Sequence, residues 1–167
     1  MRYKQPIAIV LLLMLCVFIV RLFVIDVVVV DETQTWRVYF ASEEDVILLP
    51  EIRLGNPTLN DRLQALVNGP HQSGLNPIFP EGTMVINYWL EGDILYVNLS
   101  QDVVDNHPGG SSAELITVYG LVNTMTEDPQ VARVQILVEG QRLSTIAGHV
   151  DIQHPLARDE TLIGELM

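Results

Sequence analysis

Hydrophobic residues recur at helical spacing in the stretch from Ser111 to Gly140, around which the predicted fold is arranged. Ser111, followed three residues later by Glu114, matches a capping box and predicts the start of a helix. Pro129 predicts the end of this helix, because the residue before a proline is displaced from helical geometry. The β-branched run at 131–138 predicts a strand that Gly140 closes. The buried helix face is predicted to consist of Leu115, Val118, Tyr119, Val122 and Met125.

Two extended pieces and a second helix are predicted ahead of that stretch. Residues 36–41 alternate between apolar and polar side chains and predict a strand, and residues 46–49 predict a short extended piece that ends at Pro50. An amphipathic helix follows its N-cap Thr58 and stops at Gly69-Pro70. Its apolar face is formed by Leu59, Leu63, Leu66 and Val67.

A β-hairpin is predicted between the two helices. Its strands, residues 83–90 and 94–99, flank a short turn at 91–93 that contains a glycine. Alternation leaves Trp89 on the opposite face of its strand from the other large apolar residues, where we expect it to contact a partner. The two predicted apolar faces are Met84, Ile86, Tyr88 and Leu90 on the first strand, and Leu95, Val97 and Leu99 on the second.

The order strand, helix, hairpin, helix, strand predicts an α/β (α+β) fold in which two helices pack on one face of a small mixed sheet. Residues 100–105 predict a helical turn, and residues 141–146 predict an additional edge strand. The mostly polar segment 151–167 is expected to drape over the surface or to fray.

The N-terminal segment is apolar over residues 7–25 except for Arg21, and this run is long enough to cross a bilayer as a helix. Arg2 and Lys4 precede it, whereas acidic residues follow it, so the positive-inside rule places the N-terminus in the cytoplasm. A cleaved signal peptide, lipidation at Cys16 and a buried core helix are the alternatives. An uncleaved signal anchor is favoured, because no A-x-A site follows the run and LMLC lacks the small residues usual before a lipidated cysteine.

The resulting plan is a single-pass protein of the cell membrane with its C-terminal domain outside the cytoplasm. The predicted parts are a cytoplasmic N-terminus at 1–6, a transmembrane signal anchor at 7–30, a linker at 31–35, a folded domain at 36–158 and a flexible tail at 159–167.

The charge balance excludes one class of partner. The chain has a net charge of −12, and the part from Asp31 onward carries six arginines, no lysine and 20 acidic residues, a net charge of −14. Such a surface repels nucleic acid and favours a basic partner. Cys16 is the single cysteine, so no disulfide forms within the chain.

Residues suited to catalysis or metal binding do not form a recognisable set. The four histidines, His71, His107, His149 and His154, match no common metal spacing. Asp102, Asp105 and His107 fit a solvated acidic loop better than a calcium loop. No G-x-S-x-G motif is present. We therefore predict no catalytic residue, no metal and no cofactor, and we place recognition in loop 69–82 and the loop before Ser111.

The ordered segments of the chain resemble the GerMN (sporulation and spore germination) domain family. The resemblance covers residues 36–158 and is carried by VYFASEED, LQALVNGP, GLNPIFPEGT, EGDILYVNLS, GSSAE, LVNTMTEDPQVARVQILVEGQ and VDIQHPLAR. It implies a fold similar to the ring-building motifs of secretion and sporulation complexes, preceded here by one transmembrane helix, and a non-enzymatic role outside the cytoplasmic membrane. The chain departs from the family's namesake in having one such domain and a predicted membrane anchor in place of a lipidation site.

Two functions from different classes remain. The first is a scaffold or adaptor of an envelope assembly, whose partners are the membrane, envelope or sporulation-complex proteins, or a second copy of the chain. The second is a sensory module that binds peptidoglycan or a small ligand in a pocket lined by Tyr88, Tyr96 or Tyr119. The candidate partner-binding residues are Gly74, Leu75, Pro80 and Trp89. An independent hydrolase would need an acid–base set that the sequence does not display.

Overall fold

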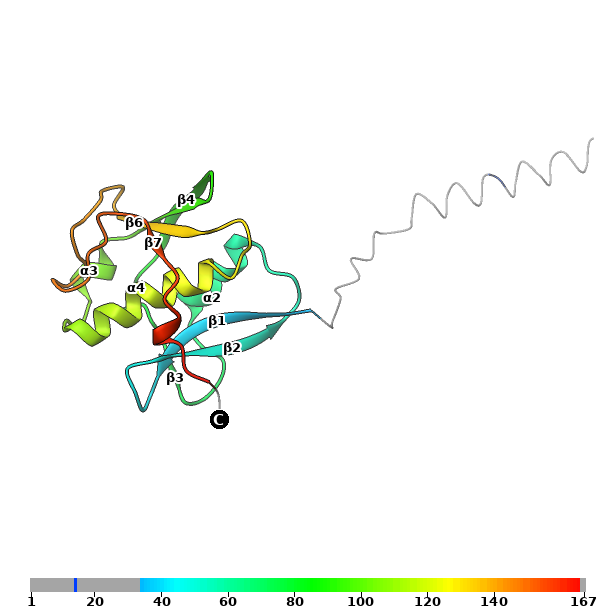
Figure 1. The fold of residues 1–167 in the computed structure, drawn as a ribbon, viewed down its shortest axis with the longest axis horizontal. Helices are drawn as coiled ribbons and strands as arrows, with labels where there is room; N and C mark the ends of the chain where they lie inside the picture. Colours follow the sequence, from blue (N-terminus) through cyan, green and yellow to red (C-terminus); the bar gives the residue numbers. More distant parts are fainter. Residues whose placement is uncertain (1–13, 15–33, 166–167) are drawn as a thin grey trace, which may run out of the picture. The chain divides into compact units, whose positions relative to one another are not determined.

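The computed structural model describes Met14 and residues 34–165 (Figure 1). The chain divides into two units, residues 1–31 and 32–167, and the elements described below belong to the second. The predicted transmembrane segment, residues 7–30, lies outside the described residues apart from Met14. Within the part that the structure describes, no helix combines the length and the apolar character needed to cross a bilayer.

The first sheet of the described domain is antiparallel and has the order β2-β1-β3. Its strands are β1 Thr35–Ser42, β2 Leu48–Leu54 and β3 Leu75–Asn76. The prediction that Pro50 ends the second strand is wrong, because Pro50 lies inside β2 opposite Tyr39. Proline is tolerated there because β2 is at the edge of this sheet. The opposite residue, Tyr39, donates its N–H to Thr124 Oγ1 and not to β2.

The second sheet has the order β4-β5-β6-β7, with β5 and β6 parallel and the other pairs antiparallel. Its strands are β4 Val85–Glu91, β5 Ile94–Leu99, β6 Arg133–Val138 and β7 Leu156–Ala157. The mixed α+β class is confirmed, but the single small sheet is replaced by two sheets. Strand patterns reveal which segments are extended and do not reveal which of them pair.

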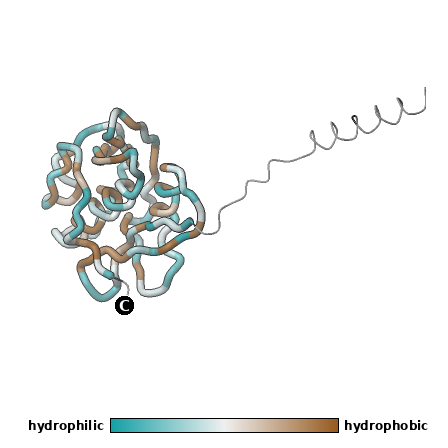
Figure 2. The backbone as a smooth tube through the Cα atoms, turned by 45° about the vertical axis from the view of Figure 1, so that its right-hand side comes forward, coloured by the Kyte–Doolittle hydropathy of each residue, from teal (hydrophilic) through white to brown (hydrophobic). Residues whose placement is uncertain are grey.

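Helix α4, Ser111–Met125, contacts β1 of the first sheet and β6 and β7 of the second (Figure 1). Every residue from Gly120 to Met125 is buried, whereas Leu115 and Tyr119 of the predicted face are only partly buried, so the prediction of one buried face is wrong. Burial on all sides of this part of α4 is typical of a helix in the core, and α4 contacts strands of both sheets. Figure 2 shows hydrophobic stretches of backbone in the domain separated by hydrophilic turns.

The shorter helices agree more closely with those predicted from the sequence. Helix α2, Leu59–Asn68, begins at its N-cap Thr58 in a capping box with Asp61 and ends at Gly69, as predicted. Its residues Leu63 and Leu66 are fully buried. The predicted helical turn at 100–105 is α3, Asp102–Asp105, and a 3₁₀ helix, η1, covers Glu160–Leu162.

The C-terminal segment is part of the folded domain as far as the structure describes it. β7 pairs with the start of β6, and Ile152 is 1% exposed. Gly164 donates its N–H to the Leu48 carbonyl of β2. Residues 159–165, which the sequence predicts as a flexible tail, therefore make defined contacts. The predicted edge strand at 141–146 reduces to an isolated bridge between Val138 and Gln141.

Candidate functional site

Strand β4 forms an exposed apolar edge of the second sheet. All its residues are exposed except the partly buried Val85, although Leu95, Val97 and Leu99 of the neighbouring β5 are fully buried. The apolar face predicted for the first hairpin strand is therefore exposed. The described residues place no strand beyond β4 in this sheet, and the side chains of β4 are exposed on both faces. The large apolar residues of this surface, called the β4 edge here, are Met84, Ile86, Tyr88, Trp89 and Leu90.

Trp89 is held in place at the β4 edge by its neighbours. Its ring stacks on Tyr96 of β5, with centroids 5.0 Å apart and an interplanar angle of 4°. Its Nε1 donates to Glu91 Oε1 at 3.1 Å. The register of β4 against β5 shifts between Val85 and Asn87, which is a bulge typical of sheet edges. Trp89 remains 38% exposed and presents a fixed aromatic surface to solvent.

An apolar groove of about 420 Å³ lies on another part of the domain. It is formed by the end of β1 and the following turn, by residues 76–80 after the start of β3, and by the first turns of α4. The turn contributes Asp45 and Val46, and α4 contributes Ser112, Ala113 and Ile116. These residues of the turn and of α4 were not predicted from the sequence. Residues 76–80 do lie in the predicted recognition loop 69–82, where the segment NPIFP places two large apolar residues between prolines.

The four predicted partner-binding residues lie in four different places. Pro80 lines the groove, whereas Leu75 is 6% exposed and packs in the core. Gly74 has a positive φ of 84°, and its carbonyl accepts the N–H of Glu43, so its role is to shape the loop. Trp89 lies on the β4 edge. The groove does bring together the two predicted recognition loops, because Pro108 from the loop before Ser111 joins residues 76–80.

The tyrosines predicted for a ligand pocket do not line this groove. Tyr88 and Tyr96 belong to the second sheet, on β4 and β5, and Tyr119 is partly buried in α4. Phe79, which is 8% exposed, is the aromatic residue among those that line the groove.

Glu114 has a role that the sequence did not reveal. The predicted capping box is wrong: Gly110 is the N-cap of α4, and among the described residues no side chain hydrogen bonds to it as a cap. The Glu114 carboxylate is fully buried and accepts the N–H groups of Ile146, Ala147 and His149 at 2.7–2.8 Å. Burial opposes ionisation, but these backbone donors outweigh it and lower the pKa of Glu114.

Glu51 of β2 repeats this arrangement at another loop. Its carboxylate accepts the backbone N–H groups of His71 and Gln72 and the Nε–H of Arg53 at 2.7 Å. Burial raises the pKa of Glu51, but the three donors lower it by more, so the net shift is downward. The carboxylates of Glu114 and Glu51 therefore hold loops in position, and their oxygens are occupied by these hydrogen bonds.

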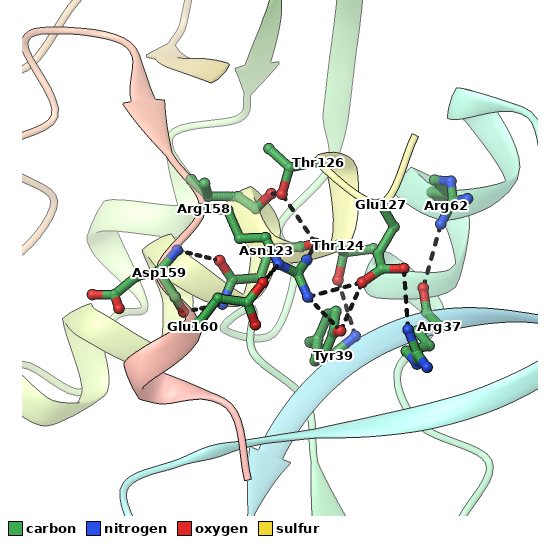
Figure 3. A network of polar contacts seen from close by, with 11 residues as sticks. Arg37, Tyr39, Arg62, Asn123, Thr124, Thr126, Glu127, Arg158, Asp159 and Glu160 are labelled. Atoms are coloured by element: carbon green, nitrogen blue, oxygen red, sulfur yellow. Dashed lines mark hydrogen bonds and ion pairs between the residues drawn. The ribbon is translucent and has the colours of Figure 1, made fainter. Parts of the chain in front are cut away.

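Arg158 connects the C-terminal segment to β1 and to the end of α4 (Figure 3). Its guanidinium donates to Tyr39 Oη at 2.7 Å and to the Asn123 carbonyl at 2.8 Å, and pairs with Glu127 at 2.9 Å. The Tyr39 hydroxyl donates to Glu127 Oε1 at 2.7 Å. Asn123 exchanges two further hydrogen bonds with the backbone of Asp159. Every member is paired within the network, which indicates a structural role.

Within the part of the chain that the structure describes, no group of three or more His, Cys, Asp or Glu side chains is placed to hold a metal ion. The side chains of Asp102 and His107, in the predicted acidic loop, form hydrogen bonds within the domain. Asp102 accepts a hydrogen bond from Ser100, and His107 accepts the N–H of Gly109 and contacts Thr117 Oγ1.

The fold defines the class of protein as a mixed α+β domain with a helix between two sheets. A family model described as "Germane: Sporulation and spore germination" matches residues 37–144, more than half of the chain. The chain therefore belongs to the Germane family of sporulation and spore germination proteins, and the resemblance to GerMN domains is confirmed.

Solved structures extend the comparison. A protein of Clostridium perfringens described as a candidate lipoprotein is 27% identical, with a TM-score of 0.53 over 74% of this chain and 87% of that one. The tandem GerMN domains of the sporulation protein GerM from Bacillus subtilis are 19% identical, with a TM-score of 0.62 over 81% of this chain and 48% of that one. The first GerMN domain of GerM alone is 16% identical, with a TM-score of 0.62 over 75% and 98%. No curated protein matches the chain significantly.

Proposed function

We propose that this chain is a non-enzymatic scaffold or adaptor of an envelope assembly, held outside the cytoplasm by residues 7–30 as a single transmembrane anchor. The sequence of that segment, with basic residues before it and acidic residues after it, supports this topology. A family named for sporulation and spore germination supports an assembly of that kind. The Clostridium neighbour supports attachment to a membrane, by lipid in its case. Anchoring raises the effective concentration of the domain for partners at the same membrane.

The observation that carries this proposal is the β4 edge. It presents five large apolar side chains and one rigid aromatic pair at a strand that the described sheet leaves open. An extended segment of a partner protein can add to such a strand by main-chain hydrogen bonds, while alternate side chains give specificity. The net charge of −14 beyond residue 30 favours a partner segment with basic flanks.

The test is crosslinking in cells with the full chain, followed by purification and mass spectrometry. Wild-type protein is expected to recover a defined set of envelope proteins. Trp89→Ala is expected to weaken that recovery about tenfold, as for an aromatic hot spot. Leu54→Ala is the matched control, because Leu54 is 69% exposed on the other sheet, and its recovery should equal that of wild type.

Equal recovery by Trp89→Ala and wild type would contradict the assignment of the β4 edge. Loss of the folded circular dichroism spectrum in Trp89→Ala would show that the residue is structural instead.

A second candidate function is a sensory module for peptidoglycan or a small ligand beside a cell-wall enzyme or sensor, and the apolar groove is the place in the described domain where such a ligand would bind. The same experiment separates the two: recovery of peptidoglycan fragments or of a cell-wall enzyme, without a stable assembly, would favour the sensory module.

A further inference from the structure

The apolar groove has a preformed floor. Ile78, Phe79 and Ile116 form its buried part and are between 3% and 8% exposed. The Ile78 carbonyl accepts the hydroxyl of Thr117 at 2.7 Å, which ties the loop segment to α4. The groove volume of about 420 Å³ lies at the small end of the range for ligand pockets, about 300–1,000 Å³. A cavity of this size and lining suits one or two apolar side chains.

The rim of the groove is acidic. Asp45 is the ionisable residue among the described residues that line it, and Glu43 and Glu44 precede it in the same exposed turn. The Ser42 hydroxyl accepts the N–H groups of Glu44 and Asp45, which fixes this turn beside the groove. None of the ion pairs among the described residues involves these three acids, so their charge faces outward.

The apolar floor and the acidic rim determine which kind of ligand fits the groove. A glycan needs many hydrogen-bond partners and an exposed aromatic face, whereas this floor is apolar and its one aromatic residue, Phe79, is 8% exposed. An anionic ligand would meet the acidic turn. A second copy of the chain would bring two domains of charge −14 together at this acidic rim. An apolar group joined to a cation satisfies both the floor and the rim.

We propose that the groove binds a short peptide segment of a partner protein in which an apolar side chain is flanked by lysine or arginine. The apolar side chain enters between residues 76–80 and α4, and the flanking cation pairs with Asp45 at the rim. This inference rests on the proposed docking function and adds a second contact surface, separate from the β4 edge, with a stated partner chemistry.

The test measures fluorescence anisotropy of three labelled peptides with the full chain in detergent. The probe is Gly-Lys-Leu-Lys-Phe-Lys-Gly, and its two controls replace lysine by glutamate or the two apolar residues by serine. We expect the basic apolar peptide to bind at least about tenfold more tightly than either control. We also expect its affinity to fall as ionic strength rises.

Variants locate the site. Ala113→Leu fills the groove from α4 and is expected to weaken binding about tenfold, whereas Ser111→Leu places the same side chain on α4 at a position that does not line the groove and should bind as wild type. Asp45→Lys should also weaken binding, and Asp151→Lys, at an exposed site elsewhere, should not. Val46→Ser is the second groove variant, because Val46 is 51% exposed and its replacement leaves the core intact.

Several results would overturn the inference. They are absence of binding by the basic apolar peptide, equal binding by either control peptide, and unchanged binding by both Ala113→Leu and Val46→Ser. Tighter binding of soluble peptidoglycan fragments, lost in the same two variants, would assign the groove to the sensory function. Trp89→Ala separates the two surfaces, because a peptide held in the groove binds this variant as it binds wild type. Loss of binding in Trp89→Ala, with binding retained in Ala113→Leu, would place the peptide at the β4 edge and overturn the inference. A negative result for peptide binding at the groove is therefore distinguishable from a negative result for partner binding at the β4 edge.

Discussion

Glu114 shows that a residue's chemical role depends on its position in three dimensions. Three residues after a serine, a glutamate usually caps a helix start, but this side chain turns into the protein and holds the loop at 146–149. A buried carboxylate is tolerated because its charge is met by three backbone donors at short distance. Glu114 thus connects α4 to a loop more than thirty positions later in the chain.

Replacing Glu114 by glutamine should reduce the free energy of unfolding by about 1–3 kcal/mol, because one amide oxygen cannot satisfy all three buried donors. Urea unfolding at neutral pH, followed by circular dichroism, measures this loss. Glu160→Gln is an exposed control that should change stability far less. Equal stability of Glu114→Gln and wild type would show that the loop does not depend on this carboxylate.

The same residue predicts how stability depends on pH. The pKa of Glu114 is lowered in the folded state, so its contribution is complete above the ordinary pKa of about 4.3 and is lost as pH falls through the lowered value. Glu51, whose pKa is also lowered, contributes with the same sign. Wild-type stability should therefore fall below about pH 4, and Glu114→Gln should show a shallower fall between neutral and acid pH. An equally steep fall in the variant would assign the acid sensitivity elsewhere.

At the scale of elements, α4 is placed by a close approach to the groove loop. A Cβ added at Gly120 would lie 2.7 Å from Ile78 Cγ2 and 2.8 Å from its Cδ1, and Ile78 is 3% exposed. Glycine at this position therefore lets the helix and the loop pack together, which keeps Ile78 at the floor of the groove.

Gly120→Ala should be destabilising even though alanine is the better helix former. Helix propensity favours alanine by about 1 kcal/mol, but overpacking costs about 1–3 kcal/mol and a β-branched neighbour yields poorly. Thermal unfolding measures the net effect. The double variant Gly120→Ala, Ile78→Val removes one of the clashing methyl groups and should cost less than the sum of the single changes. An increase in Tm for Gly120→Ala would contradict the close packing.

The two strands of the hairpin differ in what the sequence could predict about them. Both alternate, and the face that alternation assigns to Leu95, Val97 and Leu99 on β5 is fully buried. The apolar face of β4 is exposed, because alternation defines the faces of a strand and does not determine whether another element covers them. Trp89 is exposed, and so are Tyr88 and Leu90 on the opposite, apolar face of the strand.

At the scale of the whole molecule, the family match ends at residue 144 and the folded domain does not. Ile146 and Ile152 are 6% and 1% exposed in the core, β7 completes the second sheet, and Arg158 links the segment to β1. The C-terminal segment thus closes the structure around both sheets.

A chain truncated after Ser144 should therefore fail to fold. Loss of two buried isoleucines costs about 2–5 kcal/mol each, and loss of the donors to Glu114 adds to this, which together approach the whole stability of a typical domain. Limited proteolysis and circular dichroism would detect the loss of structure. Truncation after Gly164 keeps these contacts and is the control. A cooperative thermal transition in the shorter chain would show that the segment is dispensable.

The sequence by itself determined the helices, most strands and their order, because local spacing, capping residues and turn residues act over a few positions. It also determined the acidic charge, and its ordered motifs identified the family. Only the tertiary structure decided that the strands form two sheets with α4 between them, that β4 is left exposed, and that residues 41–46, 76–80 and 112–117 enclose a groove. These features depend on pairing between segments far apart in the chain, and the energy of such pairing comes from shared burial, which local patterns do not encode.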